Sequence, residues 1–425
     1  MWTCTRGAYD SDMAVSWRCF AVVLLAASAA RAAGEPISLR DAVARGGERG
    51  PGIEVAHAPS AAIDDADHAA GKLLVTPPQL SLMAGPRWNG GVTPELQTMA
   101  TVPVHLGDVR GARAGVVQSQ RNLVAKDVAR AREEAALRAA IAWSRGVEVK
   151  EIIRLRRLSL EQAQGLADVA KKRAIAGVSV PSELAMANGD LGVARAALVE
   201  AEGQLFEATA ELRVALGRAP DAELDPVGDL YAEDPRIQAV GPAWARGAEA
   251  RNSALQVLTA RQGSAKAETS LVSATLAPNL GIGVSYMREG TGDSVLLGVL
   301  TLPIPVVDPA AFERARARAE EDRATAQVHR ARQELGAQVA LSLHEIEHLR
   351  EVRAMLETNA IPPLREALRL AKVQVDTGTA DVAVALLARQ RLLAAEETLA
   401  RSCAEVWRAD LKLAHYTGQL REVSR

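Results

Sequence analysis

The residues best suited to chemistry form a short run, His344-Glu345-Ile346-Glu347-His348, which fits the zinc-protease signature H-E-x-x-H. On a helix, His344 and His348 share one face and could hold a zinc ion beside Glu345 as general base. However, Glu347 is charged where those enzymes have an uncharged residue, and no Gly-x-x-His follows to supply a third ligand. A glutamate further along the same straight helix cannot fold back to the metal. We therefore interpret the run as a chance match that binds metal only adventitiously.

No other motif points to catalysis. The chain has no phosphate-binding loop, nucleophile elbow or Cys-x-x-Cys pair, so we predict no catalytic residue, no cofactor and no metal site. A formal net charge of −2 gives no overall attraction to nucleic acid, and no nucleic-acid partner is expected. No apolar run reaches the roughly 18 residues of a transmembrane helix. The other histidines are scattered, at His57, His68, His105, His329 and His415.

The elements that position these residues are revealed by a heptad ladder that occurs twice. Leucines recur every seven residues from Leu184 to Leu212, and alanines follow three places later, from Ala187 to Ala215. The second ladder, offset by 201 residues, reads Ala385, Leu392, Leu399, Val406 and Leu413, followed by Ala388, Ala395, Ser402, Ala409 and Tyr416. A sustained seven-residue repeat predicts a helix that supercoils against a partner, and alanine lets the two axes approach closely.

The ladders belong to an internal repeat. The offset of 201 also relates Gly177 to Gly378, and an offset of 200 relates Pro78 to Pro278. Since these positions lie at helix breaks and strand ends, a constant offset indicates two copies of one hairpin unit. We predict a signal peptide over 1–33, a first repeat over 34–217, a linker over 218–235, a second repeat over 236–418 and a tail over 419–425.

The N-terminus has the form of a secretory signal. Arg18 precedes the apolar run Phe20–Ala30, and Ala30-Arg31-Ala32 offers small residues at the cleavage positions. Translation could begin at Met1 or Met13. Once the signal is removed, Cys403 is the sole cysteine, so no intrachain disulfide is expected and the thiol should pack beside the second ladder.

Periodicity and breaker residues divide the rest of the chain. Helical segments are expected over Ile37–Val75, Asp108–Ala176, Ser182–Leu216, Arg236–Val272, Asp308–Asp376 and Val382–Tyr416. Strands are expected over Pro78–Ala84 and Leu96–Val104, around the loop Gly85–Pro94, and over Leu280–Met287 and Ser294–Leu302. Each of the two long helices spans about 100 Å at 1.5 Å per residue, which is too long for a globule.

The strands have the alternation of a membrane β-barrel. Leu280, Ile282, Val284 and Tyr286 point one way, which we predict is towards lipid, and glycines and a serine point the other way. Half-buried strands of a soluble sheet share this pattern. Four strands cannot close a barrel around a pore, and open edges are not tolerated in lipid, so several chains would have to pool their strands. Three chains would supply twelve.

At this point the sequence resembles the TolC-like outer-membrane factor family over nearly everything after the signal. The resemblance rests on Ile37-Ser38-Leu39-Arg40-Asp41-Ala42, Pro78-Gln79-Leu80, Pro278-Asn279-Leu280, Leu302-Pro303-Ile304-Pro305, and the turns at Gly177 and Gly378. It implies a mostly α-helical fold with a small membrane β part: a trimer with a twelve-stranded β-barrel and a long coiled-coil α-barrel. Leu302–Asp308 looks most like the branch that serves heavy-metal and multidrug pumps.

In this family the helix turns form the periplasmic tip that docks the adaptor and closes the aperture. By position, the docking role is implied for Gly177, Val178, Ser179, Gly378, Thr379 and Ala380, and an aperture role for Ser182, Glu183 and Asp381. The chain departs from the best-known members, which have an arginine at the position of Ala380 and carboxylates at the positions of Val384 and Leu387. Glu183 and Asp381 are equally well read as helix-start acids favoured by the helix dipole.

The resulting expectation is a non-enzymatic exit duct in the outer membrane and periplasm of a Gram-negative bacterium. The resemblance implies a homotrimer that works with a periplasmic adaptor protein and an inner-membrane pump. Three alternatives stay open: a type I secretion duct of the same fold, served by a secretion transporter; a secreted coiled-coil structural protein whose strands pair within one soluble head; and a periplasmic zinc protease resting on the H-E-x-x-H run.

Overall fold

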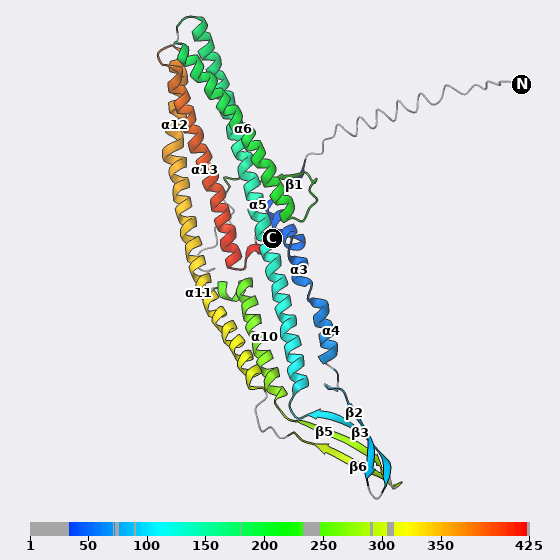
Figure 1. The fold of residues 1–425 in the computed structure, drawn as a ribbon. Coiled ribbons are helices and arrows are strands. Elements are labelled where there is room, and N and C mark those ends of the chain that lie inside the picture. Colours follow the sequence, from blue (N-terminus) through cyan, green and yellow to red (C-terminus); the bar gives the residue numbers. More distant parts are fainter. Residues whose placement is uncertain are drawn as a thin grey trace, which may run out of the picture.

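The protein is an elongated molecule with strands at one end and helix turns at the other (Figure 1). The computed structural model describes residues 34–70, 72, 76–88, 91–178, 180–232, 247–289, 292–303 and 310–422. The predicted signal peptide, residues 1–33, lies outside the described residues. No helix in the described part of the chain is both long and apolar enough to cross a membrane.

The first long helix, α5, runs the length of the helical region. It spans Val109–Ile175 and is about 100 Å long. Its N-cap is Asp108, whose Oδ1 accepts the backbone N–H of Gly111 at 2.8 Å. The first ladder helix, α6, spans Pro181–Ala215 and packs back along α5. The ladder alanines of α6 are buried and its leucines are buried or half-buried against α5 and α13. The predicted helical hairpin is confirmed.

The second long helix is interrupted, which the sequence interpretation missed. Instead of one helix over 308–376, the structure has α11 over Ala311–Met355, a π-helical turn η1 over Leu356–Ala360, and α12 over Ile361–Asp376. Pro362 and Pro363 explain the interruption, because proline lacks the N–H that a continuing α-helix needs and its ring clashes with the carbonyl four residues back. The second ladder helix, α13, spans Val382–Tyr416.

Shorter elements cover the middle and lower parts of the long helices. They are β1 (Glu35–Ile37), α2 (Leu39–Arg49), α3 (Ile53–His57), α4 (Ser60–Ala70), β4 (Leu224–Pro226), α9 (Ala248–Arg251), α10 (Ser253–Thr275) and η2 (Leu420–Glu422). Strands β1 and β4 pair in parallel. The predicted linker, which contains β4, therefore belongs to the folded body, and Ile37 lies in a strand rather than in the predicted helix. Gln419 and Leu420, which begin the predicted tail, are 7% and 1% exposed and therefore pack against the folded body.

Four antiparallel strands form a sheet in the order β2-β3-β5-β6, which span Gln79–Trp88, Val92–His105, Asn279–Arg288 and Ser294–Thr301. The predicted loop over 85–94 was too long, because β2 and β3 stay paired as far as Trp88 and Val92. Backbone pairing does not depend on side-chain polarity. Pro86 is on the edge strand β2, and its partner Pro94 lies before the part of β3 that pairs with β5, so proline is tolerated at both positions.

The largest core lies at mid-length, where the repeats meet. Trp143 of α5 and Trp407 of α13 pack edge to face with ring centroids 6.0 Å apart. The indole N–H of Trp143 donates to the carbonyl of Ile37 at 2.9 Å. Cys403 lies in this core and is 1% exposed, as its position beside the ladder predicts.

Candidate functional site

Two turns reverse the helical hairpins at the end of the molecule opposite the sheet (Figure 1). Gly177 and Gly378 have φ of +72° and +76°, a left-handed conformation that glycine adopts without steric cost. The N–H of Val178 then bonds the carbonyl of Arg173 at 3.1 Å, and that of Thr379 bonds Gln374 at 2.9 Å. These are the helix-ending bonds of a Schellman motif. The helix breaks predicted at both glycines are therefore confirmed, and their docking role stays a prediction.

The predicted tip residues are largely exposed. Val178 and Thr379 are exposed and Ala380 is half-buried, whereas Ser179 lies outside the described residues. Val178 is 67% exposed and Val384, inside the second ladder helix, is 49% exposed.

Glu183, an expected aperture residue, is only 4% exposed and joins the two turns. Its Oε1 accepts the backbone N–H of Val382 at 3.2 Å and lies 3.2 Å from Nε of Arg173. Arg173 in turn donates to the carbonyl of Val375 at 3.1 Å. Glu183 lies in the first turn of α6, as the helix-start interpretation requires, and its carboxylate also accepts an N–H at the start of α13.

The other two aperture candidates, Asp381 and Ser182, are exposed. Oδ1 of Asp381 accepts the N–H of Ala383 at 2.8 Å, so this residue is the N-cap of α13. No side chain caps α6 in the same way; Pro181 occupies its first turn instead, where the missing N–H has no intrahelical partner to lose.

A second link between the hairpins lies further from the turns and has no counterpart in the sequence interpretation. Asp190 of α6 and Arg389 of α13 form an ion pair at 2.6 Å, with side chains 7% and 4% exposed. Arg389 also donates to the carbonyl of Ser159 on α5 at 3.1 Å and to its hydroxyl. The second carboxylate oxygen of Asp190 accepts from Gln390 at 2.9 Å. One buried network therefore ties α5, α6 and α13 together.

The sheet at the opposite end has one markedly apolar face. In register, Leu82, Thr98, Tyr286 and Leu296 form one row across the four strands, and neighbouring rows on that face add Leu80, Ala100, Val284, Gly298, Val102, Ile282 and Leu300. Of the residues predicted to face lipid, Ile282, Val284 and Tyr286 are exposed and Leu280 is half-buried. On the opposite face Ser285 is 2% exposed and accepts a hydrogen bond from Gln97 at 3.0 Å.

The H-E-x-x-H run lies on α11, midway along the second long helix. Both His344 and His348 are exposed, and so is Glu345, while Ile346 packs into the core. No group of three potential metal-binding side chains gathers anywhere in the residues that the structure describes. The geometry therefore offers a histidine pair on a helix surface without a third ligand.

Part of the chain matches a known family model, and its fold matches solved structures. Residues 244–419 match the family model described as outer membrane efflux protein. The outer membrane protein VceC of Vibrio cholerae superposes with a TM-score of 0.72 at 15% identity, covering 89% of this chain and 96% of VceC. The CmeC outer membrane channel of Campylobacter jejuni gives 0.71 at 13% identity, covering 90% and 86%. The open state of the MtrE outer membrane channel of Neisseria gonorrhoeae gives 0.65 at 15% identity, covering 90% and 89%.

The solved structures confirm the predicted chain fold, mostly α-helical with a small β part, and the family model agrees with the resemblance stated from the sequence over residues 244–419. No curated protein matches the chain in sequence.

Proposed function

We propose that this chain, which has the fold of the outer membrane efflux channels and matches their family model over residues 244–419, is the outer-membrane channel of a tripartite efflux pump. The observation that carries the proposal is the four-stranded sheet with one apolar face, mounted at the end of helices about 100 Å long. Such a molecule can anchor in a membrane at one end and reach across the periplasm with the other.

Assembly as a homotrimer follows from the sheet edges. Within the chain, β2 and β6 each pair on one side only, and exposed edges in lipid would leave backbone groups without partners. Three chains pairing β6 of one with β2 of the next give a closed barrel of twelve strands. Further support comes from α6, which carries exposed apolar side chains that a neighbouring subunit would cover: Val193, Val199, Phe206 and Val214, each about two-thirds exposed.

The turns around Gly177 and Gly378 then lie at the periplasmic end, where an adaptor protein and, through it, an inner-membrane pump would dock. Transport through such a duct is passive. The chain would contribute a path and a docking surface but no reaction.

The oligomeric state tests this function. Purified in detergent, the protein should run as a trimer, and removal of detergent should precipitate it, because the apolar sheet face would be exposed to water. A stable monomer in detergent-free buffer would contradict the channel and favour the secreted coiled-coil alternative.

Replacing both histidines of the H-E-x-x-H run with glutamine tests the absence of catalysis. We expect His344→Gln with His348→Gln to leave trimer yield and resistance to an exported compound unchanged, because both side chains are exposed on α11. Zinc-dependent peptide hydrolysis that is present in the wild type and lost in Glu345→Ala would refute a purely passive role.

A further inference from the structure

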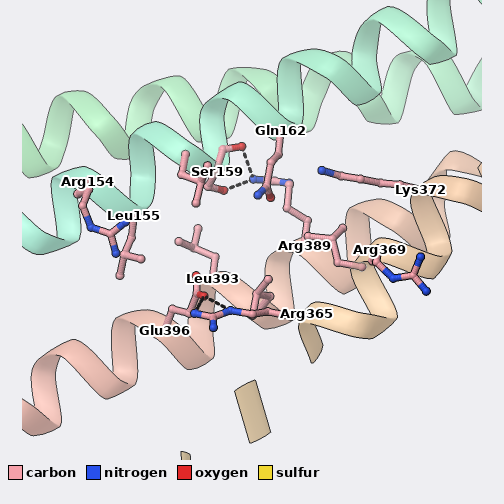
Figure 2. A pocket seen from close by; sticks show the side chains of 13 residues that line it. Arg154, Leu155, Ser159, Gln162, Arg365, Arg369, Lys372, Arg389, Leu393 and Glu396 are labelled. Atoms are coloured by element: carbon pink, nitrogen blue, oxygen red, sulfur yellow. Dashed lines mark hydrogen bonds and ion pairs between the residues drawn. The ribbon is translucent and has the colours of Figure 1, made fainter. Parts of the chain in front are cut away.

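A groove of about 440 Å³ opens between α5, α12 and α13, on the tip side of mid-length. Figure 2 shows its lining. Leucine side chains form part of its walls, and the charged lining residues are five basic ones and a single acidic one: Arg154, Arg365, Arg369, Lys372, Arg389 and Glu396. A concentration of one charge sign in a concave site attracts ions of the opposite sign.

Four of these basic side chains already have acidic partners. The pairs are Arg154 with Glu151, Arg365 with Glu396, Arg369 with Glu366, and Arg389 with Asp190. Lys372 is different, because it is half-buried and its ammonium makes no hydrogen bond or ion pair with any residue in the described part of the chain. Lys372 is therefore the basic group of the groove whose charge no acidic side chain in the described residues balances.

Unused hydrogen-bond donors line the same groove as this ammonium. Figure 2 shows the nitrogen of Lys372 directed towards Gln162 and Arg389. Gln162 is half-buried and its amide is likewise unpaired within the described residues. Arg389 is 4% exposed, and its Nε is a buried donor without an acceptor. Buried N–H groups normally have acceptors, so the inner wall of the groove calls for an oxygen atom that the chain itself does not supply.

We propose that this groove binds a small oxyanion, with inorganic phosphate as the probe, between Lys372, Gln162 and the guanidinium of Arg389. An oxyanion offers several acceptor oxygens around one centre and carries the charge that Lys372 lacks. A neutral ligand would leave the ammonium uncompensated, and a cation would be repelled by the unpaired charge of Lys372. Because Lys372 comes from α12, Gln162 from α5 and Arg389 from α13, the bound anion would join three helices. The site is independent of the proposed channel function.

The test is phosphate binding to the full-length protein in detergent, measured by titration calorimetry with chloride added to hold the ionic strength constant. We expect saturable binding at one site per chain. Lys372→Gln should weaken it at least tenfold, because the single uncompensated charge is lost. Lys171→Gln provides the matched control, since Lys171 is exposed on α5 and does not line the groove. It should bind as the wild type does.

A second variant guards against a folding defect in Lys372→Gln. Gln162→Ala keeps every charge of the groove and removes only the amide donor, so it should weaken binding about threefold or more while the circular dichroism spectrum stays unchanged. Absence of saturable binding to the wild type, or equal binding by Lys372→Gln and the wild type, would overturn the proposal. So would equal weakening by Lys171→Gln and Lys372→Gln, because that result would indicate diffuse attraction to surface lysines.

Discussion

Removing one member of the buried pair Asp190–Arg389 should loosen the helical hairpins far more than removing an exposed pair. Asp190→Leu leaves the guanidinium of Arg389 buried, with only neutral oxygens of Ser159 as acceptors. An uncompensated buried charge of this kind costs about 3–5 kcal/mol. The double variant Asp190→Leu with Arg389→Met removes both charges, and apolar replacement of a whole buried pair is nearly neutral or even stabilising. The two changes should therefore be strongly non-additive.

Hydrogen exchange is the suitable assay, because a large oligomer does not unfold in two states and local opening can be read segment by segment. A cost of 3 kcal/mol raises a local opening constant by more than about a hundredfold. Amides of α13 around Arg389 should thus exchange at least about a hundred times faster in Asp190→Leu. In the double variant the rates should return to within about tenfold of the wild type.

The exposed pair Glu366–Arg369 on α12 supplies the control. Its nitrogen and oxygen lie 2.7 Å apart, close to the separation in the buried pair, but the side chains are 53% and 62% exposed. Pairs in water contribute at most about 1 kcal/mol, so Glu366→Leu should accelerate exchange in α12 less than about fivefold. The reasoning fails if Asp190→Leu has an effect no larger than this control, or if the double variant exchanges as fast as the single one.

Three further outcomes are expected. Leu296→Arg should block assembly in outer-membrane fractions, since Leu296 is 73% exposed on the apolar sheet face and a charge near mid-bilayer costs about 2–4 kcal/mol per chain. Leu297→Arg, at the next residue and on the opposite face of the sheet, should assemble better. Equal yields of the two variants would mean that this face does not contact lipid. Gly177→Val with Gly378→Val should preserve trimers but lower efflux and adaptor crosslinking, because valine is strained at positive φ; full resistance to an exported compound would remove the turns from the docking end. Burial lowers the pKa of His415 below 6.5, so the unfolded chain binds more protons than the folded one below that pH. Thermal stability should therefore fall as the pH drops through about 6.5, and His415→Gln should make the stability less dependent on pH. An unchanged pH dependence in this variant would exclude His415 as the cause.

The features that could be predicted from the sequence are those determined by residues close together in the chain. The ladders identified the buried faces of α6 and α13, because burial of every seventh residue is a property of one helix. The turns at Gly177 and Gly378 were equally visible, since a left-handed residue after a helix selects for glycine. Strand alternation identified the exposed face of β5 for the same reason.

The features that escaped prediction depend on competition or distance. Pro362 lies within an otherwise helical pattern, and whether such a proline ends, kinks or widens a helix depends on the neighbours that hold it. The pairs Glu183–Val382 and Asp190–Arg389 each join residues 199 positions apart. No local period relates these partners, although a charged residue next to a heptad seam, as Asp190 is, marks a position that needs one.

The residues at the helix turns also show why a residue's role is inferred less securely from a family resemblance than the fold is. Under the repeat offset of 201, Asp381 corresponds to Val180 and Glu183 corresponds to Val384, so each copy has an acid where the other has valine. Yet both carboxylates stabilise the start of one helix, α13, through the N–H groups of Ala383 and Val382. Glu183 of the first copy therefore stabilises a helix of the second copy, whereas α6 in the first copy begins with a proline and has no side-chain cap. Glu183 is only 4% exposed, whereas Asp381 is exposed although its Oδ1 caps α13, so Asp381 is the exposed carboxylate among the expected aperture residues. An acidic ring made by three subunits would therefore carry one carboxylate per chain at this level.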